Sequence, residues 1–86
     1  MSFQNLFAYR LKELRIAKGL SQTELAAELD ISLKTYNNWE IKARIPLLET
    51  LCKLAAYFNV TLDYLTGYDY LSGNHTDDDS TLDTAI

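Results

Sequence analysis

The residues with the clearest chemical potential stand in one short segment, where a cation and two amides recur at helical spacing. At 100° per residue, Lys34, Asn37 and Asn38 fall on one side of a helix, and Tyr36 and Trp39 fall on the other side. Asparagine amides suit adenine edges in the major groove of DNA, and a lysine suits guanine acceptors or a phosphate. Asparagine is a poor helix former, so two adjacent ones favour a binding surface over the alternative, a merely polar face.

Other residue types that support chemistry are scarce. The single cysteine, Cys52, cannot form an internal disulfide or a thiolate cluster, and its place on an apolar stripe predicts a buried, inert thiol. The single histidine, His75, precedes three aspartates (Asp77, Asp78, Asp79), but this run lacks the glycine and the terminal glutamate of a calcium loop. We therefore expect no catalytic site, no metal and no cofactor.

Helix signals around the polar segment define the elements that must position it. An apolar stripe predicts a first helix over residues 5–18, which Gly19 ends. Ser21 and Glu24 fit the capping box of a short second helix. Ser32 is a suitable N-cap for a third helix that runs through Glu40. Only two residues separate the second helix from that cap, so the two helices must meet at a sharp angle.

The second half of the chain predicts two more helices. Residues 41–47 contain the only proline and are expected to form a loop. A fourth helix follows over residues 48–58, with Leu48, Leu51, Cys52, Ala55 and Phe58 as its apolar positions. Thr61 caps a last turn over 62–65, which Gly67 closes. The fold class is therefore all-α, with five helices in one domain over residues 1–67.

Charge divides the 86-residue chain unevenly. The net charge is −4, but residues 1–67 carry eight basic and seven acidic residues, whereas residues 68–86 carry five acidic residues and no basic one. The segment 68–86 is accordingly read as an acidic, disordered tail. No apolar run is long enough to cross a bilayer and no secretory signal is visible, so a cytoplasmic protein without membrane contact is expected.

Three strings of the sequence resemble the lambda-type phage repressor and Cro helix-turn-helix family, also called XRE-like. They are RLKELRIAKGLSQTELAAELDIS, KTYNNWE and PLLETLCKLAAYFNVTLDYLTG, within residues 10–67. The resemblance implies a five-helix domain whose third helix enters the major groove while the second helix crosses the backbone.

Site residues follow from the same resemblance. It implies that Gln22 contacts a phosphate and that Arg15 and Glu40 form an ion pair between the first and third helices. Lys42 and Arg44 lie in the loop where this family contacts the DNA backbone. Thr35 either donates to a phosphate or covers the start of the third helix. The base-reading positions correspond to Leu33, Lys34, Asn37 and Asn38, with Leu33 as a thymine-methyl contact.

Three positions depart from the family pattern. Asp30 stands where the family has a glycine in the turn, and aspartate tolerates a left-handed conformation better than most residues. Tyr36 stands where the family has a branched aliphatic residue inside the third helix, so the packing must accommodate a ring. Leu47 replaces the serine that often caps the fourth helix, so that helix start is expected to be frayed or shifted. Tyr36 and Trp39 are expected in the core and not stacked on bases. The basic residues Arg10, Lys12 and Lys18 are expected to be plain surface.

The expected function is a sequence-specific regulator of transcription that binds double-stranded DNA, most simply as a repressor. A weak homodimer through the fourth or fifth helix and residues 68–71 is expected, because tyrosines and Leu71 gather there. The acidic tail either solubilises the protein or competes with DNA for the basic face. Two alternatives stay open: an antitoxin-type autoregulator that binds a toxin through its tail, and a protein-interaction module without DNA binding.

Overall fold

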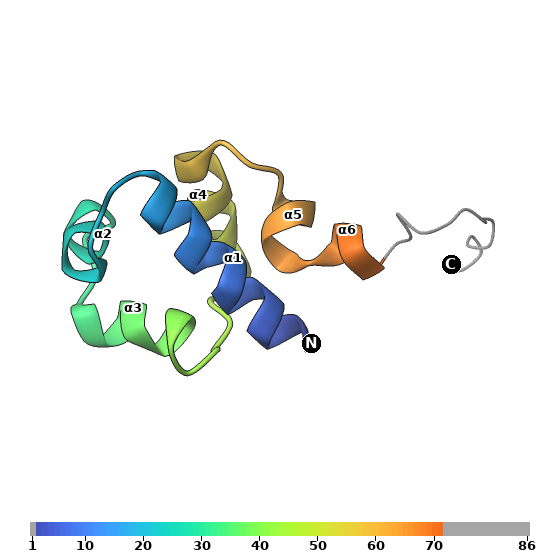
Figure 1. The fold of residues 1–86 in the computed structure, drawn as a ribbon, viewed down its shortest axis with the longest axis horizontal. Coiled ribbons are helices and arrows are strands. Elements are labelled where there is room, and N and C mark those ends of the chain that lie inside the picture. Colours follow the sequence, from blue (N-terminus) through green and yellow to red (C-terminus); the bar gives the residue numbers. More distant parts are fainter. Residues whose placement is uncertain (1, 72–86) are drawn as a thin grey trace.

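A computed structural model describes residues 2–71, and within that range the chain forms six helices and no strand. Figure 1 shows α2 and α3 at one end of the folded part and α5 and α6 at the other, with α1 running between the two ends. The predicted all-α class is confirmed. In chain order the helices are α1 (Phe3–Ala17), α2 (Gln22–Glu28), α3 (Leu33–Glu40), α4 (Leu48–Phe58), α5 (Leu62–Thr66) and α6 (Tyr68–Leu71).

Side-chain caps fix the start of most helices. The predicted capping box is present in α2: the Glu24 amide donates to the Ser21 hydroxyl over 3.0 Å, and the Ser21 amide donates to the Glu24 carboxylate over 2.8 Å. Ser32 and Thr61 cap α3 and α5 as expected. The first helix starts earlier than predicted because Ser2 accepts a hydrogen bond from the Asn5 amide. The fourth helix begins after Leu47 without a side-chain cap.

The turn between α2 and α3 sets the angle of the third helix. Asp30 adopts the left-handed conformation (φ 59°), as its place in the turn predicted. The Ile31 amide then reaches the Ala26 carbonyl over 3.0 Å, and the Asp30 amide reaches the Ala27 carbonyl over 3.1 Å. This pair of bonds is the Schellman arrangement, which satisfies the last carbonyls of α2. Ala26 is 3% exposed, so its small side chain lies inside the angle.

The core lies between α1, the α2–α3 pair, α4 and α5. Tyr36 is completely buried and meets the nearly buried Trp39 edge-on, with 5.9 Å between ring centroids. The prediction that these two rings pack inward is confirmed, and their position leaves the opposite side of α3 outside the core. The other fully buried large side chains are Phe7, Leu11, Leu25, Leu54 and Leu65.

The fourth helix corrects one prediction. Its buried stripe consists of Leu51, Leu54, Ala55 and Phe58, whereas Cys52 is exposed. The expectation of a buried thiol was wrong. Neighbouring residues of a helix point 100° apart, so Cys52, next to the buried Leu51, lies beside the stripe and not on it. Leu48, also expected inward, is 66% exposed.

The sixth helix was not predicted, since residues 68–71 were assigned to the acidic tail. Arg10 joins this helix to α1 and α5: its guanidinium donates to the Tyr64 carbonyl and to the Asp69 carboxylate, the latter over 2.7 Å. The same group lies 4.2 Å from the centroid of the Tyr64 ring. Arg10 is therefore a structural residue, and its assignment to plain surface was wrong. Lys18 was also assigned there, but its ammonium lies 4.8 Å from the centroid of the Tyr57 ring.

Residues 72–86 lie outside the described residues. The predictions about this segment, namely a disordered tail and no metal at His75 and its neighbouring aspartates, therefore stay predictions. Among the helices that the structure describes, none is long and apolar enough to span a membrane.

Candidate nucleic-acid interface

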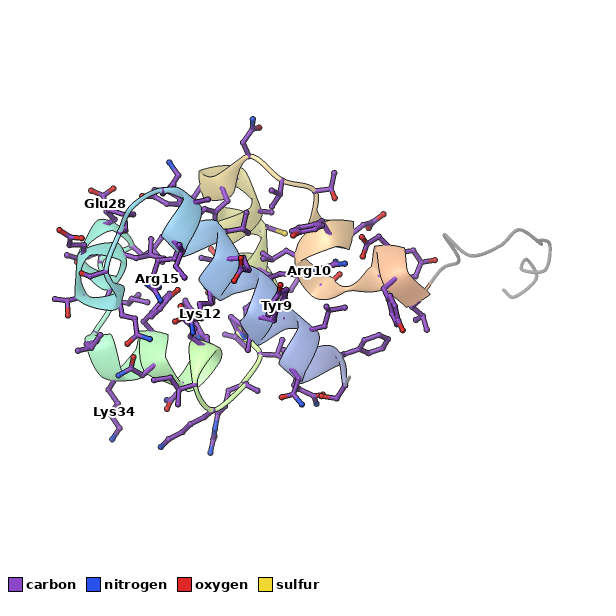
Figure 2. All side chains as sticks on the ribbon, in the orientation of Figure 1. Tyr9, Arg10, Lys12, Arg15, Glu28 and Lys34 are labelled. Atoms are coloured by element: carbon purple, nitrogen blue, oxygen red, sulfur yellow. The ribbon has the colours of Figure 1, made fainter. Side chains whose placement is uncertain are left out.

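The side of α3 that faces away from the core carries the predicted reading residues. Leu33, Lys34 and Thr35 are exposed, and Asn37 and Asn38 are half-buried. Figure 2 shows the side chain of Lys34 projecting from α3 away from the other helices. The helix thus has one face anchored by aromatic rings and one face that presents a cation and two amides to solvent.

The start of α3 is held by hydroxyl groups. The Ser32 hydroxyl accepts from the Thr35 amide over 3.0 Å and donates to the Thr35 hydroxyl oxygen over 2.9 Å. Thr35 therefore covers the helix start, which is one of the two roles expected for it. The Thr35 hydroxyl only accepts in this contact, so its own proton is available to a phosphate.

The loop after α3 turns sharply and exposes two cations. Ala43 adopts a left-handed conformation (φ 54°), and the Arg44 amide donates to the Asn38 carbonyl over 2.8 Å. Lys42 and Arg44, on either side of Ala43, are both exposed. A left-handed residue with a side chain is strained, and such strain collects at functional sites. Nothing in the sequence indicated that an alanine would take this conformation.

The reading side of α3 and the following loop are positively charged, although the whole chain is acidic. Lys34, Lys42 and Arg44 form no ion pair among residues 2–71. The only acidic residue between Asp30 and Glu49 is Glu40, whose side chain is 2% exposed and is paired with Arg15. No carboxylate among residues 2–71 pairs with these three cations, so all three can attract an anionic partner.

A cluster around the Glu40 carboxylate fixes α3 against α1 and α2. Arg15 donates to both carboxylate oxygens, from Nε over 3.0 Å and from Nη2 over 2.9 Å, so the expected pair is bidentate. Gln22 donates its Nε2 to Oε1 over 2.8 Å, and the Tyr36 hydroxyl donates to Oε2. Figure 2 shows Arg15 extending from α1 toward α2 and α3. We call Arg15, Gln22, Tyr36 and Glu40 the Glu40 cluster.

The Glu40 cluster controls the ionisation of its members. Burial alone would raise the pKa of Glu40, but the hydrogen bonds from Arg15, Tyr36 and Gln22 outweigh it and bring the pKa below its usual value. Burial and the hydrogen bond to Glu40 raise the pKa of Tyr36, which stays neutral. The hydrogen bond to Glu40 raises the pKa of Arg15. The centre of the cluster is one buried carboxylate, whose oxygens accept hydrogen bonds from three donor residues.

Two members of the cluster were not expected there. Tyr36 stands four residues before Glu40, a spacing that brings two side chains together on a helix and would have revealed the contact. Gln22 was predicted as a phosphate contact, and the structure shows one of its amide protons donated to Glu40. The second proton of that amide remains available. No sequence signal indicated the Gln22–Glu40 bond, because it joins two different helices.

Comparison with known proteins agrees with this geometry. The sequence model of the helix-turn-helix family matches residues 11–65. The transcriptional regulator ImmR of Bacillus subtilis (strain 168) is 39% identical over 79 residues, covering 90% of this chain and 62% of ImmR. The cryptic phage CTXphi transcriptional repressor RstR of Vibrio cholerae is 30% identical over 81 residues, covering 94% of this chain and 68% of RstR.

A prophage-derived regulator, YonR of Bacillus subtilis (strain 168), is 39% identical over 70 residues, covering 81% of this chain and 60% of YonR. The chain thus spans roughly three fifths of the length of ImmR and YonR. The family match includes the turn between α2 and α3, the whole of α3 and the Glu40 cluster. The chain belongs to the helix-turn-helix family, in the lambda-repressor and Cro type that its sequence resembles.

Proposed function

We propose that this protein is a sequence-specific transcriptional regulator that binds double-stranded DNA with α3 in the major groove. The observation that carries the proposal is the exposed side of α3, where Lys34, Asn37 and Asn38 stand together above two buried aromatic rings. An α-helix with its side chains is about 10–12 Å in diameter, which fits a major groove about 12 Å wide. Leu33, 40% exposed at the start of the helix, suits a thymine methyl group.

Phosphate contacts would position the domain before bases are read. Lys42 and Arg44 are exposed and lack ion-pair partners among residues 2–71, so they are suited to the DNA backbone. Gln22 has one amide proton left for a phosphate, and the bond to Glu40 holds that amide in place. Thr35 adds a hydroxyl at the start of α3.

The names of the relatives support regulation of transcription. RstR is named a repressor, and BcrR of Enterococcus faecalis, 32% identical over 77 residues, is named an activator. We favour repression by occupation of a promoter, because this needs only DNA binding. Such a role would place the protein in the cytoplasm and involves no catalytic step.

A homodimer would let two copies read a two-fold site. Exposed apolar side chains lie near the end of the folded part: Tyr68, Tyr70 and Leu71 on α6, and Phe3 at the start of α1, close to Gly67. Such a patch suits a weak self-association, which would let two reading helices reach half-sites about 34 Å apart. Sedimentation of the full chain and of its Leu71→Glu variant tests this. The variant should have a lower dimer fraction, and an unchanged fraction would show that this patch is not the interface.

Selection of random duplex DNA by the full chain tests the main proposal. We expect the selected DNA to be enriched in one sequence motif. A variant with alanine at Lys34, Asn37 and Asn38 should show no such enrichment. Alanine at Lys53, an exposed cation on α4, is the matched control and should leave the motif unchanged. No enrichment with the parent protein would contradict the proposal and favour a protein-interaction module.

Salt dependence then separates the phosphate contacts from the base contacts. Alanine at Lys42 or at Arg44 should reduce the slope of log K against log salt by about 0.9 for each phosphate that the variant no longer neutralises. Alanine at Gln22 should weaken binding with little change in slope, because an uncharged amide releases no counterion. Equal slopes for Lys42→Ala, Arg44→Ala and the parent protein would remove these cations from the interface.

A further inference from the structure

The side chain of Asn37 contains a polar atom that the fold leaves unsatisfied. Its carbonyl oxygen, Oδ1, is buried and accepts no hydrogen bond within the part of the chain that the structure describes. Unsatisfied buried acceptors are uncommon in folded proteins, because the desolvation of the oxygen is not compensated. We therefore expect an apolar side chain at this position to favour folding, and the presence of an amide points to a role outside folding.

The orientation of this amide determines which base edge it fits. Because Oδ1 is the buried end, the nitrogen Nδ2 is the end nearer to solvent, and it makes no hydrogen bond among the described residues. Two-point recognition of adenine requires an amide that accepts from N6 and donates to N7. Asn37 as it is held offers donors only, so it does not fit adenine in this way.

Lys34 lies one turn before Asn37 on the same side of α3 and also has only donors. In the major groove, two acceptors stand side by side on one base only at guanine, which presents N7 and O6. Asn38 is not subject to the same restriction, because no atom of its side chain is an unsatisfied buried one.

On these grounds we propose that Lys34 and Asn37 act together as a donor pair that reads guanine, and that Asn38 is the adenine-reading amide. This inference rests on the proposed binding of α3 in the major groove and adds the base class to it. It also implies that Asn37 lowers the stability of the folded protein, through its unsatisfied oxygen, while it contributes to DNA specificity.

A stability measurement tests the buried oxygen without DNA. Asn37→Leu removes the unsatisfied acceptor, and Asn38→Leu makes the same change in helix propensity at the neighbouring position, so it is the matched control. We expect Asn37→Leu to raise the urea midpoint by more than Asn38→Leu does. An equal or smaller rise would overturn the claim that the Asn37 carbonyl costs stability.

A binding measurement tests the base. On the motif selected by the parent protein, Asn37→Leu should lose preference at one guanine position. Two replacements of that guanine should each weaken the parent protein about tenfold: 7-deazaguanine, which lacks N7, and adenine, which lacks the O6 acceptor. Asn37→Leu should be insensitive to the replacement that removes the acceptor bound by Asn37. Adenine selected at the position that depends on Asn37, or equal sensitivity of both proteins to both replacements, would overturn the inference while leaving DNA binding intact. Failure of the parent protein to select any motif would instead contradict the proposed function.

Discussion

Replacing Glu40 by glutamine should destabilise the protein strongly, whereas the same change at Glu49 should have almost no effect. The Glu40 carboxylate is 2% exposed and accepts hydrogen bonds from Arg15, Gln22 and Tyr36. Glu49 pairs only with Lys53, over 3.6 Å, and both side chains are at least three-quarters exposed. The two substitutions are chemically identical, so any difference reports the surroundings of the carboxylate.

The expected magnitudes follow from burial. Glutamine at position 40 leaves the Arg15 guanidinium, 11% exposed, without a counter-charge, and breaking a buried pair costs about 3–5 kcal/mol. Glutamine keeps the shape of the side chain and some hydrogen bonds, so we expect the lower end, about 3 kcal/mol. The exposed pair of Glu49 contributes at most about 0.5 kcal/mol. Since small domains have about 5–15 kcal/mol in total, the first loss is a large fraction and the second is negligible.

Urea unfolding followed by tryptophan fluorescence measures both variants. Trp39 is the only tryptophan, it lies on α3, and it is 8% exposed, so its emission reports loss of the core around the Glu40 cluster. With a slope of about 1–1.5 kcal/mol per molar urea, Glu40→Gln should lower the midpoint by roughly 2–3 M. Losses that agree within about 0.5 kcal/mol for the two variants would refute the reasoning, because burial would then not matter.

Three further predictions follow from other features. The pKa of Glu40 is lowered in the folded state, so its stabilising effect is complete above its unfolded pKa of about 4.3 and is lost as the pH falls through the folded value. Urea midpoints measured from pH 7 to pH 2 should therefore decline less steeply in acid for Glu40→Gln; parallel curves would contradict this. Ala43→Gly should stabilise the protein by about 0.5–1 kcal/mol, because glycine adopts the left-handed conformation without strain, while Ala27→Gly on the exposed side of α2 should destabilise it by a similar amount. Absence of stabilisation in Ala43→Gly would show that the turn is unstrained. Asp69→Asn removes the ionic partner of Arg10 and should speed hydrogen exchange at the Tyr70 and Leu71 amides with little change in the Trp39 unfolding midpoint; unchanged exchange would mean that α6 does not depend on this contact.

The sequence by itself determined the order and most ends of the helices, because their signals are local. A cap such as Ser21 or Ser32 bonds an amide three residues away, so the interacting groups are visible in the sequence. Helical rotation of 100° per residue likewise separated Tyr36 and Trp39 from the polar side of α3 before any packing was known. The candidate reading residues could be named for the same reason.

Only the tertiary structure decided which side chains meet across helices. Arg10 binds Asp69 from 59 residues away, and Gln22 binds Glu40 from 18 residues away, so neither bond has a local pattern. The exposure of Cys52 depends on which face of α4 packs against the other helices. The spacing of apolar residues locates that face only to within one residue. The buried oxygen of Asn37 is of the same kind: the sequence shows that an amide stands at this position, but only the tertiary structure shows that its carbonyl oxygen is buried without a hydrogen-bond partner.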